Sequence, residues 1–214
     1  MAAEFMDQAI EIPRIEAADT PWGVRVLDVR AVTQNMISTS ADPECAANAI
    51  SYDHEDGLTF AGLEPLMPRV IGAMIPFRVE APLGDGALFR PRVMEHKWAI
   101  FHRGGRIFFV RGWTRKLHVV ADLSAQEGSV AITRLNGVFL DAEEHPLLTT
   151  MMADFLLRSH VLGMVYPAPL PEGMEESPQQ AAMWCFHVFG SMALCATSEI
   201  IPMHMPDQPL RLLE

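Results

Sequence analysis

The clearest pattern in the chain is a series of short apolar stretches, rich in β-branched and aromatic residues, in its middle third. Turn-forming sequences separate these stretches at short intervals: RGGR, GWTR and SAQEG. Links of this length force neighbouring strands to run antiparallel. The pattern therefore predicts a β-meander with strands at 97–102, 106–111, 116–122 and 129–135.

Weaker signals predict further elements before the meander. Asp42 followed by Pro43 is typical of a helix start, so we expect a short helix at 42–50. Pro76 lies inside an apolar run and has no N–H to donate, so the strand expected at 71–80 belongs at a sheet edge. The remaining expectations are a valine-rich strand at 22–32 and loops at 51–69 and 81–91.

The last third of the chain changes to a helical pattern. Apolar residues recur at helical spacing over 145–163, and Ser177-Pro178 suits the start of a second helix. The stretch 181–196 within that helix is apolar on all sides but shorter than a membrane span, which is typical of a buried core helix. The expected irregular segments are the linker 165–177 and the proline-containing tail with Pro202, Pro206 and Pro209.

Strands first and helices last predict an α+β fold. We expect an antiparallel β-meander sheet with two C-terminal helices, the last one buried against the sheet. Residues 1–21 read as an acidic lead-in, and 22–214 as a single α+β domain.

Composition narrows the functional classes. The 214 residues carry a formal net charge of −11, which argues against general binding to nucleic acid or anionic membranes. Three cysteines are an odd number and no disulfide framework, and the first residues lack a basic segment followed by an apolar run. These features predict a cytoplasmic protein that binds neither nucleic acid nor membranes.

Against this acidic background, residues 90–118 contain eight Lys and Arg and a single acid, so they carry +7 while the rest of the chain carries −18. A two-residue turn at Gly104-Gly105 would place Arg103 opposite Arg106 and Trp98 opposite Arg111. Facing arginines repel each other unless an acidic loop of the same chain or an acidic ligand neutralises them. A nucleic-acid surface is a third possibility, but no RNA-binding motif accompanies the charge.

We therefore predict a non-catalytic binding or regulatory module that engages an acidic protein or peptide partner through a basic, aromatic sheet surface. The alternative that the arginines form a solvated face, neutralised by the chain's own acids, stays open. The candidate partner-binding residues are Trp98, His102, Arg103, Arg106, Arg111, Trp113 and Arg115.

A second hypothesis is a small hydrolase or metal-dependent enzyme with a pocket between sheet and helices. Its candidate residues are His160, His187, His204 and Cys185, and it requires at least three of them to converge. HExxH, CxxC and GxSxG motifs are absent from the sequence, so no metal site and no cofactor are expected. A third hypothesis is a homodimer formed through the methionine-rich helical face.

Overall fold

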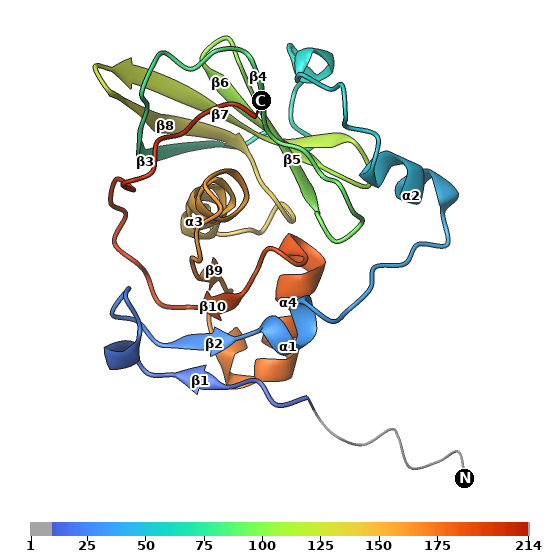
Figure 1. Cartoon of the computed structure of the whole chain (residues 1–214), viewed down its shortest axis with the longest axis vertical. Helices are drawn as coiled ribbons and strands as arrows, with labels where there is room; N and C mark the ends of the chain where they lie inside the picture. Colours follow the sequence, from blue (N-terminus) through green and yellow to red (C-terminus); the bar gives the residue numbers. More distant parts are fainter. Residues whose placement is uncertain (1–9, 214) are drawn as a thin grey trace.

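Two β-sheets organise the chain in the computed structural model, which describes residues 10–213 (Figure 1). The larger sheet is antiparallel, with its six strands in the order β3-β8-β7-β6-β5-β4. Its strands are β3 (Val70–Arg78), β4 (Gly86–Phe89), β5 (Trp98–Arg103), β6 (Arg106–Arg111), β7 (Lys116–Gln126) and β8 (Ser129–Gly137). The α+β class and the meander are confirmed, whereas β4 forms inside a segment predicted to be a loop.

The smaller sheet has the order β1-β2-β10-β9, and only the β9–β10 pair is parallel. Its strands are β1 (Arg14–Ile15), β2 (Val26–Asp28), β9 (Ala168–Pro169) and β10 (Cys195–Thr197). The strand predicted at 22–32 is therefore too long, because the short helix α1 (Arg30–Thr33) begins directly after Val29. Of the predicted lead-in, residues 1–9 lie outside the described residues, and 14–15 pair with β2.

The longer helices begin where the sequence predicts. They are α2 (Pro43–Ala49), α3 (Pro146–Leu156) and α4 (Pro178–Phe189), and α3 continues as a π-helical turn, Leu157–Val161. The Asp42 side chain accepts the Glu44 N–H at 2.9 Å and caps α2, whereas Ser177 precedes α4 without a side-chain cap. Short 3₁₀ segments occupy Ala17–Asp19, Leu58–Phe60 and Met174–Glu176.

Helix α4 ends at Phe189 and does not continue to residue 196 as predicted. Gly190 has a φ of 69°, and a Cβ at this position would lie 1.7 Å from the Glu95 carbonyl oxygen. The chain can therefore turn here only with glycine, and Ser191 lies beyond the helix instead of inside it.

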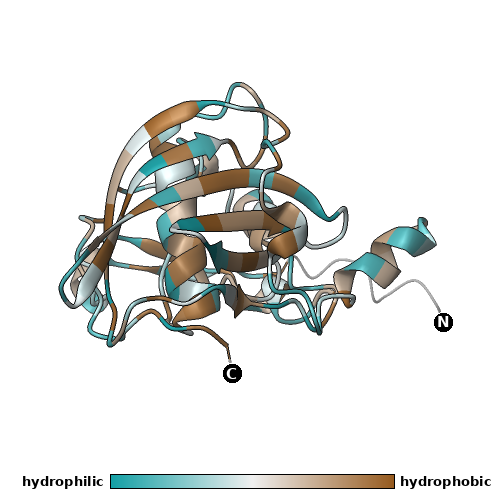
Figure 2. Cartoon of the chain, turned by 90° about the horizontal axis from the view of Figure 1, so that it is seen from above, coloured by the Kyte–Doolittle hydropathy of each residue, from teal (hydrophilic) through white to brown (hydrophobic). Residues whose placement is uncertain are grey.

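Alternation along the strands gives the large sheet two buried faces. Ile100 and Phe109 belong to the main core together with Phe155 of α3, which lies across the concave face (Figure 1). Phe101 belongs to a second apolar cluster that Tyr52 and Phe60 complete from the segment before β3. Figure 2 shows the alternating apolar and polar bands of the strands and α2 projecting from the body.

Helix α3 lies across the large sheet, and the last helix is buried against the same sheet at its C-terminal end. Helix α4 packs on α1 and near β10, and it reaches the large sheet with its C-terminal turn, where Gly190 pairs with His96. Strand β3 forms one edge, as its proline predicted. Within residues 10–213, no helix is both long and apolar enough to cross a lipid bilayer.

Candidate binding site: the basic hairpin and its groove

The β5–β6 hairpin has the register that its Gly-Gly turn predicts. Arg103 pairs with Arg106 and Trp98 with Arg111. Gly104 and Gly105 have φ values of 57° and 75°, the left-handed pair that a tight hairpin turn requires. The hairpin thus has an outer end at its turn, and an inner end where β5 begins and β6 finishes.

At the inner end, Trp98 and Arg111 cap the last turn of α4. The Trp98 Nε1–H donates to the Val188 carbonyl at 2.8 Å. The Arg111 guanidinium donates to the Val188 and His187 carbonyls at 2.9 and 2.7 Å, and lies 5.0 Å from the centre of the Trp98 ring. The final carbonyls of a helix lack partners within the helix, so these donors satisfy them.

The prediction that Trp98 belongs to a partner-binding surface is therefore corrected, whereas Arg111 is half-buried and its guanidinium is engaged by helix carbonyls. Trp98 has no exposed area, because the C-terminal turn of α4 covers it. Burial lowers the pKa of Arg111 to about 10, so its guanidinium remains charged at neutral pH. Its charge acts on helix carbonyls inside the protein.

Trp113 is also held from within. Its Nε1–H donates to the Met94 carbonyl at 2.8 Å, and the Lys97 ammonium lies 4.2 Å from its ring centre. Lys97 is 3% exposed and donates to the Ser38 hydroxyl at 2.5 Å. Burial, with the nearby charge of Arg111, lowers the pKa of Lys97 to about 8. The inner end is thus a packed cation–aromatic cluster.

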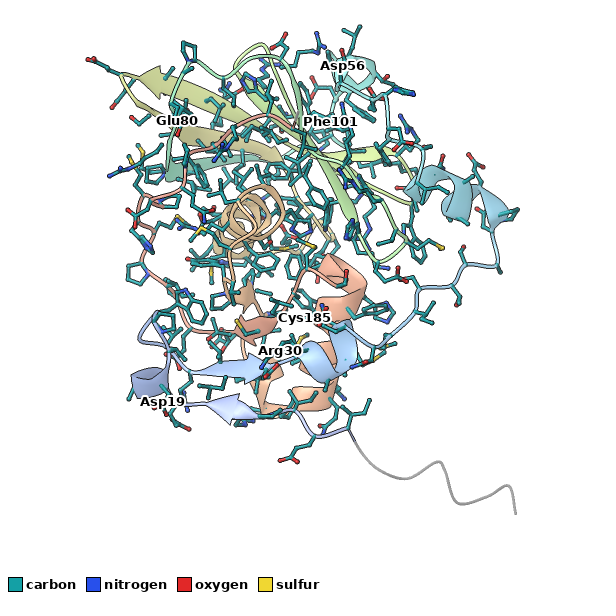
Figure 3. The ribbon with its side chains drawn as sticks, viewed as in Figure 1. Asp19, Arg30, Asp56, Glu80, Phe101 and Cys185 are labelled. Atoms are coloured by element: carbon teal, nitrogen blue, oxygen red, sulfur yellow. The ribbon has the colours of Figure 1, made fainter. Side chains whose placement is uncertain are left out.

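Acidic side chains of the segment before β3 and of the β3–β4 loop neutralise two of the predicted arginines, Arg103 at the outer end and Arg115 in the turn between β6 and β7. Arg103 contacts Asp56 at 2.6 Å and Asp85 at 3.5 Å, and Arg115 contacts Glu55 at 2.6 Å. Asp56 lies on the segment outside the sheet, near Phe101 (Figure 3). The open alternative, that the chain's own acids neutralise the basic hairpin, therefore describes both arginines.

The charge of Arg106 is less completely neutralised than those of Arg103 and Arg115. It contacts Asp122 at 3.2 Å, and the same carboxylate accepts a hydrogen bond from Arg134 Nε at 2.6 Å. Both arginine side chains are 56% exposed, so one carboxylate serves two guanidinium groups on this surface. Arg134 was not predicted from the sequence, although the meander places it opposite Asp122, the cross-strand neighbour of Arg106.

His102 connects the hairpin to a groove. Its Nδ1 lies 2.7 Å from the Gly84 carbonyl, which fixes the proton on Nδ1 in the neutral ring and leaves Nε2 as an acceptor. The groove has a volume of about 410 Å³, and its lining includes His102 and Gly105. Its walls are the segments 79–83 and 123–130.

The groove combines apolar walls with an acidic rim. Leu83, Leu123 and Val130 line it, together with the exposed Glu80 and Glu127. Figure 3 shows Glu80 on the far side of the large sheet from Asp56. Apolar walls with a few polar groups are typical of binding sites, and a volume of roughly 300–1,000 Å³ is usual for them.

The candidates for metal binding or hydrolysis do not come together. His160 is buried between Phe89 and Phe155, and burial lowers the pKa of His160 to about 3. His187 and His204 are exposed on α4 and the tail. Among residues 10–213, no group of three or more His, Cys, Asp or Glu side chains has the arrangement needed to hold a metal ion.

A buried ion pair between Asp154 and Arg158 was not predicted from the sequence. The Arg158 Nε–H donates to Asp154 at 2.7 Å, and the guanidinium lies 4.7 Å from the Tyr166 ring centre. Arg158 has no exposed area. Burial raises the pKa of Asp154, although Arg158 opposes that effect. An acid and an arginine four residues apart in an apolar helix were the available signal.

Comparisons with protein-family models, with curated proteins and with solved structures find no match for this chain. Its function is therefore inferred from its own geometry.

Proposed function

We propose that this protein is a non-catalytic binding module that takes a short peptide segment of a partner protein in the groove beside the β5–β6 hairpin. One observation carries the proposal: the groove of about 410 Å³ has apolar walls and lies directly against the hairpin turn. The seven residues predicted from sequence contribute one side chain to it, that of His102.

The rim determines which peptides we expect to bind. Glu80 and Glu127 are exposed beside the apolar walls, and none of the hydrogen bonds or ion pairs found among residues 10–213 involves their carboxylates. Opposite charges across an interface favour correct partners and faster association. The preferred segment therefore carries apolar side chains next to a lysine or arginine, and the Nε2 of His102 can accept one of its N–H groups.

A hexapeptide array tests this assignment. We expect wild-type protein to bind spots with apolar and basic residues, and Leu123→Gln with Glu127→Lys to lose at least about tenfold of that affinity. Glu143→Lys changes an exposed acid outside the groove and serves as the matched control. If the wild type and the double variant bind the same spots equally, the groove is not the peptide-binding site.

An acidic partner remains a second candidate because Arg106 and Arg134 share the single carboxylate of Asp122. Its surface is smaller than the sequence predicted, since Trp98 and Arg111 are buried or engaged inside the protein. On the same array, Arg106→Glu with Arg134→Glu would abolish binding to acidic spots. Retained binding of acidic spots by this variant would exclude the two arginines.

A further inference from the structure

The C-terminal tail lies on the large sheet in the manner of a bound peptide. After β10, residues 198–213 form no helix or strand. The Leu210 N–H donates to the Arg78 carbonyl at 2.7 Å, and the Leu213 N–H donates to the Ala87 carbonyl at 2.9 Å. Arg78 ends β3 and Ala87 lies in β4, so the tail bridges the two edge strands of the sheet (Figure 1).

Two alternate side chains anchor this segment. Leu210 is 2% exposed and belongs to the main core. Leu212 packs above Gly84 and Gly86, with a methyl carbon 3.4 Å from where a Cβ on either glycine would lie. Arg211 is exposed between them. Main-chain bonds for affinity and alternate side chains for specificity characterise peptides that add to sheet edges.

The stretch that leads to these anchors is held mainly by side chains, because Ile201 is buried in the main core and Pro206 is also buried. It contains Pro202, Pro206 and Pro209 and leaves Ile200 62% and Met205 39% exposed. Arg158 donates to the His204 carbonyl at 2.5 Å, which ties the middle of the stretch to the buried ion pair. The last residues thus resemble a ligand on a proline-containing tether.

We propose that the slot formed by Arg78, Gly84, Gly86 and Ala87 is a peptide-docking site that the tail fills as an internal competitor. Its external occupant is an extended partner segment with two leucines two residues apart after a proline, the pattern of Pro209–Leu213. A tethered competitor has a high effective concentration, so the partner binds well only when the tail's hold is weakened. The slot shares no lining residue with the groove, and the proposal does not depend on the groove's function.

Fluorescence anisotropy with a labelled synthetic peptide of residues 206–214 tests the slot on the full-length chain. We expect Leu212→Ser to bind the peptide roughly tenfold more tightly than wild type, because its own tail competes less. Leu213→Ser changes a side chain that is 40% exposed and should behave as wild type. Equal affinity in all three chains, or no binding, would overturn the proposal.

A second measurement tests whether the tail is a replaceable ligand if Leu212→Ser does not fold. A protease recognition site placed at the exposed His204-Met205 allows the tail to be cut in the folded protein. A docked tail remains associated after cutting and exchanges with the labelled peptide. A cut protein that unfolds, or that never exchanges its tail, shows that the tail is a fixed part of the core.

Discussion

The two ends of the β5–β6 hairpin carry the same types of residue in different environments. At the inner end, Trp98 is buried and Arg111 is half-buried, and both donate to the carbonyls that end α4. At the outer end, Arg103 and Arg106 form ion pairs with acidic side chains at the surface. A basic, aromatic sequence therefore does not identify a surface until burial is known, because the same side chains can satisfy the protein's own polar groups.

The largest expected loss of stability comes from the tight contact between Gly190 and the Glu95 carbonyl, next to the inner end. Gly190→Ala would place a Cβ 1.7 Å from the Glu95 carbonyl, so we expect a loss above about 4 kcal/mol in unfolding free energy or no folded protein. Gly62→Ala has a comparable positive φ but nothing within 4 Å, and should cost only about 1 kcal/mol. Urea denaturation of both variants checks this, and similar losses would contradict it.

Removing the helix cap should have the next largest effect. Arg111→Met removes the guanidinium hydrogen bonds to the Val188 and His187 carbonyls. We expect the free energy of unfolding to fall by about 3 kcal/mol. Arg106→Met at the outer end should cost less than about 0.5 kcal/mol, because its ion pair is exposed. Equal losses in thermal denaturation would show that the two ends do not differ as described.

The buried ammonium predicts a pH dependence specific to the inner end. The pKa of Lys97 is lowered from 10.5 to about 8 on folding, so the unfolded chain binds its proton more strongly. The contribution of Lys97 to the unfolding free energy should therefore rise as the pH increases from about 8 to 10.5, by about 1–3 kcal/mol. Lys97→Met should lack this rise, and denaturation at several pH values measures it. An identical pH profile for the variant would be incompatible with a buried Lys97.

Apart from the Arg106→Met control, the smallest expected loss of unfolding free energy concerns the outer ion pair of Arg103. Arg103→Gln should change the unfolding free energy by less than about 1 kcal/mol, since the Arg103 side chain is partly exposed and Asp56 is half exposed. High salt should reduce even this difference, whereas the effect of Arg111→Met should persist. A large, salt-independent loss of unfolding free energy in Arg103→Gln would show that the outer ion pair stabilises the fold as strongly as the helix cap at the inner end.

Local sequence determined the hairpin well. The Gly104-Gly105 turn fixed which residues face each other across β5 and β6, because the loop length of a hairpin sets its register. Asp42-Pro43 likewise located the start of α2, since a side-chain cap acts on the next two or three residues. In each case the interacting groups are close in sequence.

The candidate site depended on contacts that no local pattern contains. Asp56 meets Arg103 across 47 residues, and Arg111 meets Val188 across 77. Only His102 of the predicted residues lines the groove, whose walls come from the segments 79–83 and 123–130. The end of α4 was missed for the same reason, because Gly190 turns against the Glu95 carbonyl of another element.

The sequence by itself determined the α+β class, the antiparallel meander and the charge contrast between residues 90–118 and the rest of the chain. These properties follow from residue period, turn length and composition, all of which are local or additive. The tertiary structure alone decided which arginines are enclosed, which are paired and where the groove and the tail slot lie. Those outcomes depend on which distant segments exclude water from each side chain, and one charged residue can be buried or exposed without any change in its neighbours along the chain.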